Sequence, residues 1–490
     1  MTHSSTDMLL GINALNHDAS IALVHGTEVK FAAHSERYSR IKNDRLLNKG
    51  IVEDMLQYGT PSRILCAGNP FVEASRRLYS GERPVWSNIK QHLRDVGLGD
   101  IPITYTAHHE SHAAMGYYTS GFDKAAVVVM DAVGEWNCTS IWLGEGDRLT
   151  RQLTVNYPDS FGLFYSAMTK AIGLKPNEEE YILMGMAALG KPIHVQELLE
   201  DLFDDFSPPY LSLKDNLHRG VGDYIKDKEW DDADVAASTQ AIAEQYIVGC
   251  ANYVKKEYRI RNLVLVGGVA LNCVANGKIR DRGWFDGIWV PPNPGDAGLS
   301  LGAVLSLTKT QINFNTAFLG YDIKRPLSTA AIVDALTSEK IIAVANGRAE
   351  FGPRALGNRS ILADPRGPTI KDSVNAIKRR EEFRPFAPVI LEEHAKDYFA
   401  NIGHNQRYMQ WTNDCLFPEQ FPAICHFDGS SRVQTVPKDF STIRFILEEW
   451  YNRTGCPMLL NTSLNIKGEP LVNTWADAER FSQLHSVKVF

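Results

Sequence analysis

Two histidines and two aspartates of this chain have the residue types and positions of metal ligands. His108 and His112 are four residues apart at the expected start of a helix, so their imidazoles share one helix face at a spacing suited to a metal ion. Asp131 ends an expected strand, and Asp296 follows the carboxyl end of another. Because α/β folds place ligand-binding acids at that edge of a sheet, the four residues make a reasonable two-nitrogen, two-oxygen set for a divalent ion.

The same residues also admit a structural interpretation, which the sequence leaves open. A lone histidine pair at this spacing is more often structural than metal-binding. Asp296 is also placed to cap the helix that follows it. The run His-His-Glu-Ser-His is not the zinc-protease motif, because Ala113 stands where that motif needs its second histidine.

A second candidate site lies in residues 351–384, FGPRALGNRSILADPRGPTIKDSVNAIKRREEFR, where basic side chains outnumber acidic ones. Gly352 and Gly357 place the first arginines on a loop. Most charge runs are solvated faces, but apolar residues flank Arg384 closely, and a buried guanidinium needs an anion. We therefore expect an oxyanion or phosphate site, since arginine matches such oxygens two at a time. The cations of this stretch include Arg354, Arg359, Lys378 and Arg384.

Several turns offer further polar groups. His17 lies at the tip of a strand–turn–strand segment, either as a loop histidine bonded to backbone or as a base or phosphate contact. Gly267 and Gly268 follow an expected strand, 262–266, and such a turn brings backbone close to a nucleotide, although the signal is weak. Asn461 and Ser463 belong to an expected polar turn after a strand, and a turn within 425–436 contains Arg432.

The elements that must position these residues suggest a duplicated α/β architecture. Residues 8–24 read as strand, turn and strand, and residues 125–142 repeat that pattern roughly 120 positions later. Each half is thus expected to present a hairpin to a central cleft. Residues 310–326 are poorly periodic and are expected to be a linker. A second domain then begins with a strand at 341–345, which gives domains at 1–322 and 323–490.

Composition excludes several classes of protein. A chain of 490 residues is too long for one core, and a net charge of -7 argues against stable nucleic-acid binding. The 7 cysteines follow no disulfide or metal pattern, which indicates a reducing, cytoplasmic location. No secretory signal is visible at the amino terminus, and no apolar run approaches the ~20 residues of a membrane span.

Motifs along nearly the whole chain resemble the NodU/CmcH O-carbamoyltransferases. They occur in the expected order and read HDASIALV, HHESHAA, DAVGEW, GGVALNC, PPNPGDAGLSLGA, FGPRALGNRSILADPR, HFDGSSRVQTV and TGCPMLLNTSLNIKGEP. The resemblance implies an N-terminal duplicated domain of the actin-like ASKHA class, similar to the metal-binding domain of threonylcarbamoyl transferases. It implies a C-terminal YrdC-like α/β domain that makes carbamoyl-adenylate from carbamoyl phosphate and ATP, with Mg²⁺ as a further cofactor.

The resemblance also implies roles for individual residues. The metal, iron(II) or another divalent ion, would be bound by His108, His112, Asp131 and Asp296. The donor site would comprise Arg354, Arg359, Lys378, Arg384, Arg432, Asn461 and Ser463. Gly267, Gly268 and Asn272 would cradle a nucleotide, and His17 would act as the base on the acceptor side. Glu36, Arg37 and Lys42 are expected to face the nucleotide or the acceptor.

The expected reaction is carbamoyl transfer to a hydroxyl of a small molecule, either an antibiotic or sugar hydroxyl or a hydroxymethyl-pyrimidine nucleotide. Two departures from the family pattern stand out: Ile182 replaces the usual lysine after Glu180 and Tyr181, and Leu464 replaces the usual phenylalanine. We also expect no membrane association, and a homodimer is one expected assembly. The alternatives are a tRNA threonylcarbamoyl transferase-like enzyme and a non-enzymatic, actin-type nucleotide-binding protein.

Overall fold

The chain forms two compact units. The structure, a computed structural model, describes residues 7–81, 88–403 and 406–490. Unit 1 consists of the residues up to Ala32 together with Arg45–Phe314. Unit 2 consists of Ala33–Asp44 and Asn315–Phe490, so a short segment from early in the chain belongs to the later unit.

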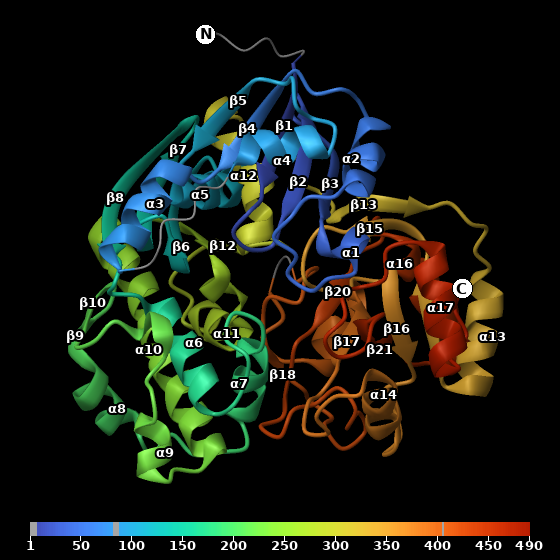
Figure 1. The fold of residues 1–490 in the computed structure, drawn as a ribbon. Helices are drawn as coiled ribbons and strands as arrows, with labels where there is room; N and C mark the ends of the chain where they lie inside the picture. The colour runs from blue at the N-terminus through green and yellow to red at the C-terminus, as the bar shows by residue number, and fades with distance from the viewer. Residues whose placement is uncertain (1–6, 82–87, 404–405) are drawn as a thin grey trace. The chain divides into compact units, whose positions relative to one another are not determined.

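Unit 1 contains two five-stranded sheets with the same strand order (Figure 1). The first runs β3-β2-β1-β4-β5 and the second β8-β7-β6-β11-β12. In each, the strand that comes first in the chain pairs antiparallel with the next strand and parallel with a later one. The first sheet consists of β1 (Met8–Asn13), β2 (Ser20–His25), β3 (Glu28–His34), β4 (Arg63–Ala67) and β5 (Ile103–Thr106). The second consists of β6 (Lys124–Gly134), β7 (Asn137–Glu145), β8 (Arg148–Asn156), β11 (Asn262–Val266) and β12 (Gly287–Trp289). The predicted duplication is therefore confirmed in the topology.

Two helices hold the sheets of unit 1 together. α12 (Leu299–Thr308) packs on the first sheet, α5 (His108–Thr119) packs on the second, and the two helices pack against each other. Their crossing is close at Gly302, where an added Cβ would lie 2.0 Å from the backbone oxygen of Ser111. The small residues of the sequence AGLSLGA thus serve to bring α12 against the helix that carries the two histidines.

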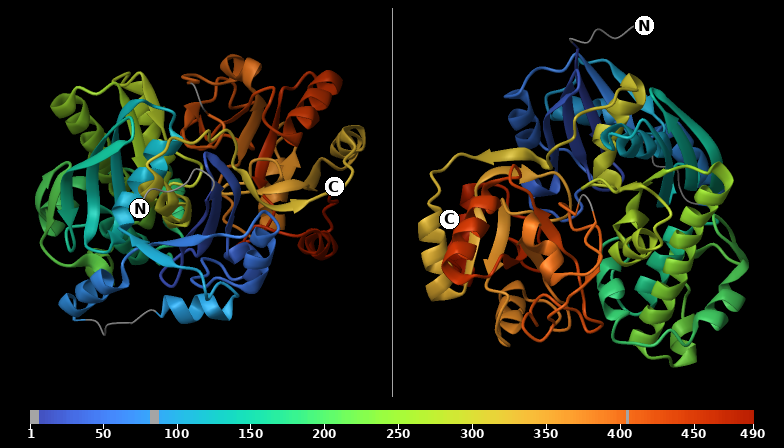
Figure 2. Two further views of the ribbon diagram at one scale, coloured as in Figure 1. Left: turned by 90° about the horizontal axis from the view of Figure 1, so that it is seen from above. Right: turned by 180° about the vertical axis from the view of Figure 1, so that it is seen from behind.

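The remaining elements of unit 1 lie around these sheets (Figure 2). The helices are α2 (Lys49–Leu56), α3 (Pro70–Tyr79), α4 (Ile89–Asp95), α6 (Phe161–Ala171), α7 (Glu180–Met186), α8 (Val195–Leu202), α9 (Tyr224–Lys228), α10 (Asp232–Tyr258) and α11 (Cys273–Asp281). Residues 195–230 contain α8, α9 and a hairpin of β9 (Phe203–Ser207) and β10 (Tyr210–Leu213). Within this acidic segment, a short apolar alternation buries Leu211 and Leu213.

Unit 2 is built on a five-stranded mixed sheet of order β14-β16-β21-β17-β20. Its strands are β14 (Ile341–Ala345), β16 (Arg359–Ala363), β17 (Ala387–Leu391), β20 (Gln434–Val436) and β21 (Met458–Ser463). Its helices are α1 (Glu36–Ser39), α13 (Thr329–Glu339), α14 (Ile370–Lys378), α15 (Ala395–Tyr398), α16 (Thr442–Thr454) and α17 (Trp475–His485). Two short strands, β18 (Asn413–Asp414) and β19 (Ser430–Ser431), pair with each other. Both units are mixed α/β, as predicted, whereas the YrdC-like assignment stays a prediction.

The segment expected to be a linker contains a strand. β13 (Phe318–Ile323) pairs antiparallel with β15 (Gly347–Glu350), so the division at 322/323 would cut through a paired strand, and the compact units divide after Phe314 instead. Gly320 and the irregular register weaken the period-2 signal of this strand, and its partner lies well downstream. The expected polar turn at Asn461 also differs, because β21 continues through Ser463.

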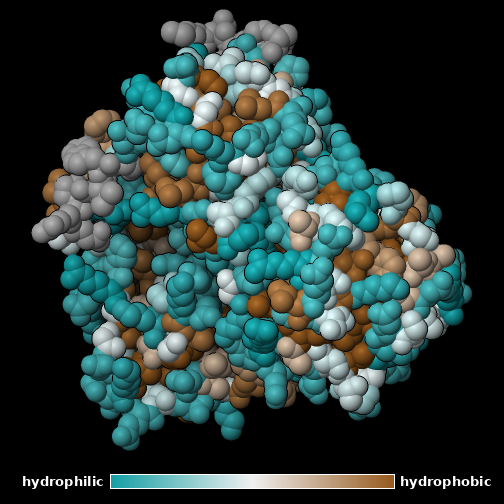
Figure 3. Space-filling view, turned by 45° about the vertical axis from the view of Figure 1, so that its right-hand side comes forward, coloured by the Kyte–Doolittle hydropathy of each residue, from teal (hydrophilic) through white to brown (hydrophobic). Residues whose placement is uncertain are grey.

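Within the residues described, no helix has both the length and the apolar content needed to cross a membrane. On the face drawn in Figure 3, hydrophobic residues form scattered patches among hydrophilic ones. All 7 cysteines are buried free thiols.

Candidate active site

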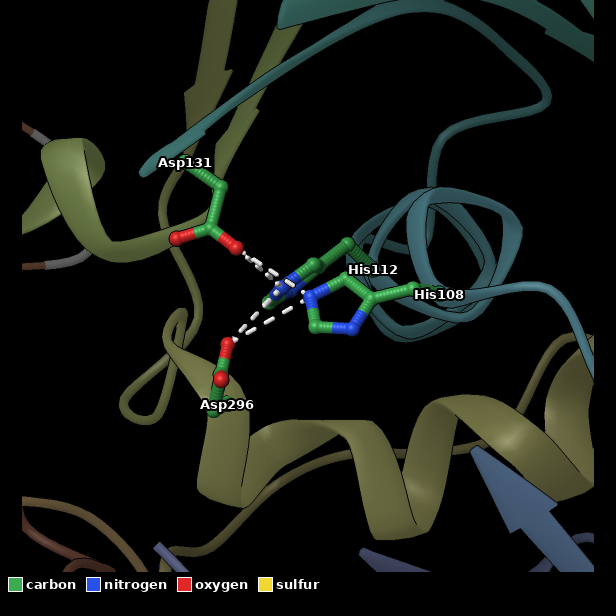
Figure 4. Close-up of side chains that lie close together, drawn as sticks. All are labelled: His108, His112, Asp131 and Asp296. Carbon is green, nitrogen blue, oxygen red and sulfur yellow. Dashed lines mark hydrogen bonds and ion pairs between the residues drawn. The ribbon is translucent and has the colours of Figure 1, made fainter. Parts of the chain in front are cut away.

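The two histidines project from the first turns of α5 (Figure 4). Their rings lie 4.9 Å apart between centroids, and both side chains are buried. Gly134 of the β6–β7 turn makes room for the first ring, because an added Cβ there would lie 2.2 Å from Cδ2 of His108. The local sequence therefore fixes the position of His108 from two sides, through the helix and through the turn.

Two carboxylates face these histidines. Asp131 lies on β6, beyond the point where the pairing with β7 becomes irregular, and Asp296 begins a 3-10 turn before α12. Gly295 and Gly298, and not Asp296, occupy the N-cap positions of the 3-10 turn and of α12, so Asp296 does not have the capping position expected for it. Nε2 of His108 lies 3.1 Å from Oδ2 of Asp131 and 3.5 Å from Oδ1 of Asp296. Nε2 of His112 lies 3.8 Å and 3.3 Å from the same two oxygens.

The arrangement fits a single divalent metal ion. The four ligand atoms lie within 4.8 Å of one another. In a tetrahedral site with bonds of about 2.1 Å, neighbouring ligand atoms are about 3.4 Å apart, close to the nitrogen–oxygen distances found here. Both ring nitrogens of His112 are buried without a hydrogen-bond partner, and an imidazole in that state is poised for a cation. The structure thus brings together the four predicted ligands, whereas the identity of the ion stays a prediction.

The histidines and aspartates of the cluster shift each other's pKa values toward the charged forms. Burial lowers the pKa of His108, but the carboxylates of Asp296 and Asp131 outweigh burial and hold that pKa well above its ordinary value. Burial raises the pKa of Asp131, but the two histidines bring it well below its usual range. Protons on the imidazoles thus compensate the carboxylates, and a divalent cation would replace them in that role.

The double glycine borders this cluster. At Gly267 the backbone has a φ of 89°, and an added Cβ would lie 2.1 Å from the oxygen of Met130. At Gly268 the added Cβ would lie 3.4 Å from Oδ1 of Asp131. Glycine at position 267 thus lets this turn pack closely against β6, and Gly268 lies beside a metal ligand, whereas their predicted nucleotide contact stays a prediction.

His17 lies at the tip of the β1–β2 hairpin, as expected. Its Nδ1 lies 2.9 Å from Oδ2 of Asp18. Burial lowers the pKa of His17, but Asp18, with smaller contributions from Asp296 and Asp131, raises it to about 9. The influence of those two aspartates places His17 in the electrostatic field of the cluster. A cation bound by them would offset that field and favour the neutral imidazole that a base requires.

In unit 2, Lys378 and Ser463 come together. Nζ of Lys378 donates to the backbone and hydroxyl oxygens of Ser463 at 2.5 and 3.1 Å, and to the carbonyl and side-chain oxygens of Asn465 at 2.8 and 3.0 Å. Burial, together with the charges of Arg380 and Arg384, holds the pKa of Lys378 well below its ordinary value. All four of these partners are neutral oxygens, so an added anion would stabilise the ammonium.

The other predicted cations occupy varied positions. Nη1 of Arg384 lies 3.2 Å from Oε2 of Glu381. Arg354 and Arg432 are partly exposed residues of unit 2. Arg37 is buried in the same unit, where its Nη2 donates to the oxygen of Gly352 at 2.7 Å, beside the loop that contains Arg354. Their contacts with a ligand stay predictions.

Arg359 corrects the expectation that a buried arginine needs an anion. It is fully buried, and its guanidinium donates to the backbone oxygens of Asn473, Asn346, Gly347, Asn358 and Tyr321. Carbonyl oxygens therefore satisfy this cation, which ties β16 to neighbouring segments. The position favours a structural role over the predicted cofactor contact.

Two predicted amide contacts are also directed inward. Asn461 donates to the oxygen of Ala355 and to Oε1 of Gln434 in the interior of unit 2. Asn272 exchanges hydrogen bonds with Gln240, and its Oδ1 also accepts from the backbone of Ala275 to cap α11. The side chain of Asn461 is therefore occupied by hydrogen bonds inside unit 2, and that of Asn272 by Gln240 and the cap of α11. Spacing along the sequence does not reveal either set of contacts.

Comparison with known proteins identifies the family. The carbamoyltransferase N-terminus model matches residues 84–305, and the carbamoyltransferase C-terminus model matches residues 333–490. An uncharacterized protein of Synechocystis sp. is 34% identical over 98% of this chain and 94% of its own length. The nodulation protein NolNO of Sinorhizobium fredii is 31% identical over 95% of this chain and 76% of its own. The chain belongs to the NodU/CmcH carbamoyltransferase family, and it is a carbamoyltransferase.

Among solved structures, a full-length HypF in its phosphate- and nucleotide-bound form is similar over 62% of this chain and 46% of its own, at 13% identity and a TM-score of 0.37. That likeness is too distant to carry an argument. Family membership does overturn one alternative, because a carbamoyltransferase is not a non-enzymatic nucleotide-binding protein.

Proposed function

We propose that this carbamoyltransferase works in two steps, with the donor activated in unit 2 and the carbamoyl group transferred in unit 1. The observation that carries the proposal is the buried cluster of two imidazoles and two carboxylates, which fits a divalent ion beside the turn of Gly267 and Gly268. The repeated strand order of unit 1 supports an actin-like arrangement for the domain that contains it.

The first step makes carbamoyl-adenylate from carbamoyl phosphate and ATP. Water releases phosphate from carbamoyl phosphate, an oxygen of the resulting carbamate attacks the α-phosphorus of ATP, and pyrophosphate leaves. Negative charge spreads over the phosphoryl oxygens during this attack, so converging cations stabilise it. Lys378 and Arg384 are close enough for the arginine to lower the pKa of the lysine. Two neighbouring cations of this kind create the positive field that stabilises an anionic intermediate.

The second step transfers the carbamoyl group to a hydroxyl. The acceptor oxygen attacks the carbonyl carbon, AMP leaves, and the hydroxyl proton passes to a base, for which His17 is the candidate. A divalent cation bound by the cluster supplies Lewis acidity. The aspartates hold negative charge beside the histidines, and the buried setting limits hydrolysis of the adenylate.

We propose a small-molecule acceptor, either an antibiotic or sugar hydroxyl or a hydroxymethyl-pyrimidine nucleotide, with Mg²⁺ accompanying ATP. The buried free thiols support a cytoplasmic site of action. A tRNA threonylcarbamoyl transferase-like activity is the second candidate, and the overall negative charge disfavours it. A homodimer also remains a proposal.

The first step can be tested without knowing the acceptor. Purified protein is given carbamoyl phosphate, ATP and Mg²⁺, and pyrophosphate and the mass of carbamoyl-adenylate are measured. We expect both products, and we expect Lys378→Met to reduce their rate by roughly 10²-fold or more, because one fixed electrostatic contact is removed. Arg453→Met is the matched control, since that arginine pairs with Asp334 and Glu449 at the surface of the same unit.

The division of labour can be tested with His108→Ala. Pyrophosphate formation should persist in this variant, while carbamoyl transfer to acceptor should fail. Well-folded protein that releases no pyrophosphate with any divalent metal would refute the two-step proposal. Loss of both steps in His108→Ala would refute the assignment of the steps to separate units.

A further inference from the structure

A buried arginine in unit 1 has no anionic partner among the residues that the structure describes. Arg76 lies on α3, and only 5% of it is exposed. Its Nε and Nη1 atoms are enclosed and have no hydrogen-bond partner. Within the described parts of the chain, no ion pair to this guanidinium is formed.

Aromatic and polar side chains surround the guanidinium. Its central carbon lies 5.3 Å from the centre of the Tyr157 ring. The hydroxyl of Tyr157 accepts a hydrogen bond from Nδ2 of Asn216 at 2.5 Å, and its ring lies 5.8 Å from that of His218. These contacts fix the tyrosine under the arginine, but they supply the cation with neither a carboxylate nor a carbonyl oxygen.

Other buried arginines of this chain have oxygen partners. Arg359 donates to five backbone oxygens. Arg444 pairs with Glu393 and Glu448. Arg37 also has an enclosed Nε and Nη1 without a hydrogen bond, but its Nη2 donates to the oxygen of Gly352 and its Nε lies 3.7 Å from Oε1 of Glu36. Arg76 has no such partner among the described residues, and a cation–π contact alone compensates little of the cost of burying a charge, so its guanidinium calls for a ligand.

The helix that carries Arg76 is attached to the hairpin that leads from the metal cluster. Asn69, which caps α3, donates its backbone N–H to Oε1 of Glu135 at 2.6 Å, and Nε1 of Trp136 donates to Oγ of Ser75 at 3.2 Å. Glu135 and Trp136 form the turn between β6, which carries Asp131, and β7.

Charge effects place Arg76 and the cluster near a common neighbour. Burial is the main reason that the pKa of the Cys138 thiol is raised to about 12, and among the smaller influences Asp131 raises this pKa and Arg76 lowers it. The thiol therefore lies within reach of both charges. Cys138 also packs in one cluster with Tyr157, and Ala132, the residue after Asp131, packs against that cluster. Tyr157 and the guanidinium over it therefore lie beside the strand that carries this metal ligand.

We infer that Arg76 binds an oxyanion of the acceptor, so that the carbamoylated molecule carries a phosphate or carboxylate as well as its hydroxyl. The guanidinium can present Nη2 together with either Nε or Nη1 as the paired donors that such a group matches, and Tyr157 and His218 provide flat surfaces beside it. This inference rests on the proposed function, because it concerns the acceptor of that same transfer. It narrows the acceptor to anionic compounds and disfavours neutral sugars and aminoglycoside-like polycations.

Inorganic phosphate is the first probe. Binding to the full chain is measured by equilibrium dialysis with radiolabelled phosphate, for the wild type, Arg76→Met, Arg76→Lys and Arg77→Met. We expect Arg76→Met to bind one phosphate fewer per chain, and Arg76→Lys to bind that phosphate about tenfold more weakly because the fork is lost. Arg77→Met is the matched control, since this neighbour on α3 pairs with Glu73, and it should behave as the wild type.

A second measurement needs no variant and covers the case in which Arg76 variants fail to fold. Phenylglyoxal modification of the wild type is mapped by peptide mass spectrometry with and without phosphate. Protection of Arg76, but not of Arg77, supports the inference. Equal phosphate binding by folded Arg76→Met and wild type would overturn it, as would an Arg76 that phosphate does not protect. Pyrophosphate release in the acceptor-free assay is read separately, so failure here is distinguishable from failure of the two-step chemistry.

Discussion

At the scale of single residues, the metal cluster depends on His112, the more deeply buried of the two imidazoles. Both of its ring nitrogens lack hydrogen bonds, and Nε2 faces both carboxylates. We expect His112→Ala to lower bound divalent metal from about one ion per chain to near zero, because four-coordinate binding needs every ligand. Metal analysis of the purified protein measures this directly. The same substitution at the partly exposed His25 of unit 1 should leave metal content unchanged, and metal retained by His112→Ala would contradict the assignment.

Glu36 gives a prediction for pH. Burial raises the pKa of Glu36, but Lys42 and Arg37 outweigh burial and lower it from 4.5 to about 2. Because the folded pKa is depressed, the carboxylate contributes stability above its unfolded pKa and loses that contribution as pH falls through the folded value. A shift of this size corresponds to an upper value on the order of 3 kcal/mol.

The test compares thermal unfolding of the wild type and Glu36→Gln between pH 6 and pH 2.5. The wild type should lose melting temperature more steeply than the variant over the window between 4.5 and 2. Glu382→Gln, at an exposed position of the same unit, should follow the wild type. Parallel pH profiles for all three proteins would show that Glu36 carries no such coupling.

The candidate site was largely predictable where spacing along a helix or position at a strand end fixes a side chain. The i, i+4 rule and the strand-end rule brought His108, His112, Asp131 and Asp296 together correctly. The same reasoning could not predict Arg359, because the carbonyl oxygens that satisfy it come from five separate positions. It could not single out Arg76 either, since no periodicity marks a buried cation without a partner.

At the scale of secondary-structure elements, the crossing of α5 and α12 positions both histidines. We expect Gly302→Ala to lower stability by about 1–3 kcal/mol, because its Cβ would meet the backbone oxygen of Ser111 at 2.0 Å. Displacement of α5 should also reduce metal content, since Ser111 directly precedes His112. Thermal unfolding and metal analysis measure the two effects. An unchanged melting temperature with full metal content would show that the helices can separate without cost.

Elements with strong local signals were predictable, and those that depend on remote pairing were not. Apolar runs on both sides of a polar turn predict the β1–β2 and β6–β7 hairpins, and the structure confirms both. β13 was missed because its partner β15 is separated from it by α13 and β14, so only the folded chain supplies the pairing. The mixed α/β class was therefore accessible from sequence, while the extent of each unit was not.

At the scale of the whole molecule, a segment from early in the chain completes unit 2. Ala33–Asp44 belongs to that unit, although more than half of the chain separates it from Asn315. Nη2 of Arg37 donates to the oxygen of Gly352 at 2.7 Å. Nη1 and Nη2 of Arg40 donate to the oxygens of Leu471 and Pro470 at 2.5 and 2.8 Å. A break placed only at 314/315 therefore removes part of the second unit's own structure.

This arrangement predicts that a fragment of residues 315–490 is unstable until a peptide of residues 33–44 is added. Hydrogen bonds from charged donors contribute about 1.5–3 kcal/mol each, less where they are partly exposed as at Arg40, so the peptide should contribute a few kcal/mol. For a fragment of this size, saturating peptide should raise the melting temperature by roughly 5–10 °C. A peptide with Arg37→Ala and Arg40→Ala should bind at least tenfold more weakly by calorimetry. The prediction is wrong if the fragment folds fully by itself and neither peptide changes its unfolding. In that case the early segment is dispensable to unit 2, and the hydrogen bonds of Arg37 and Arg40 do not stabilise that unit.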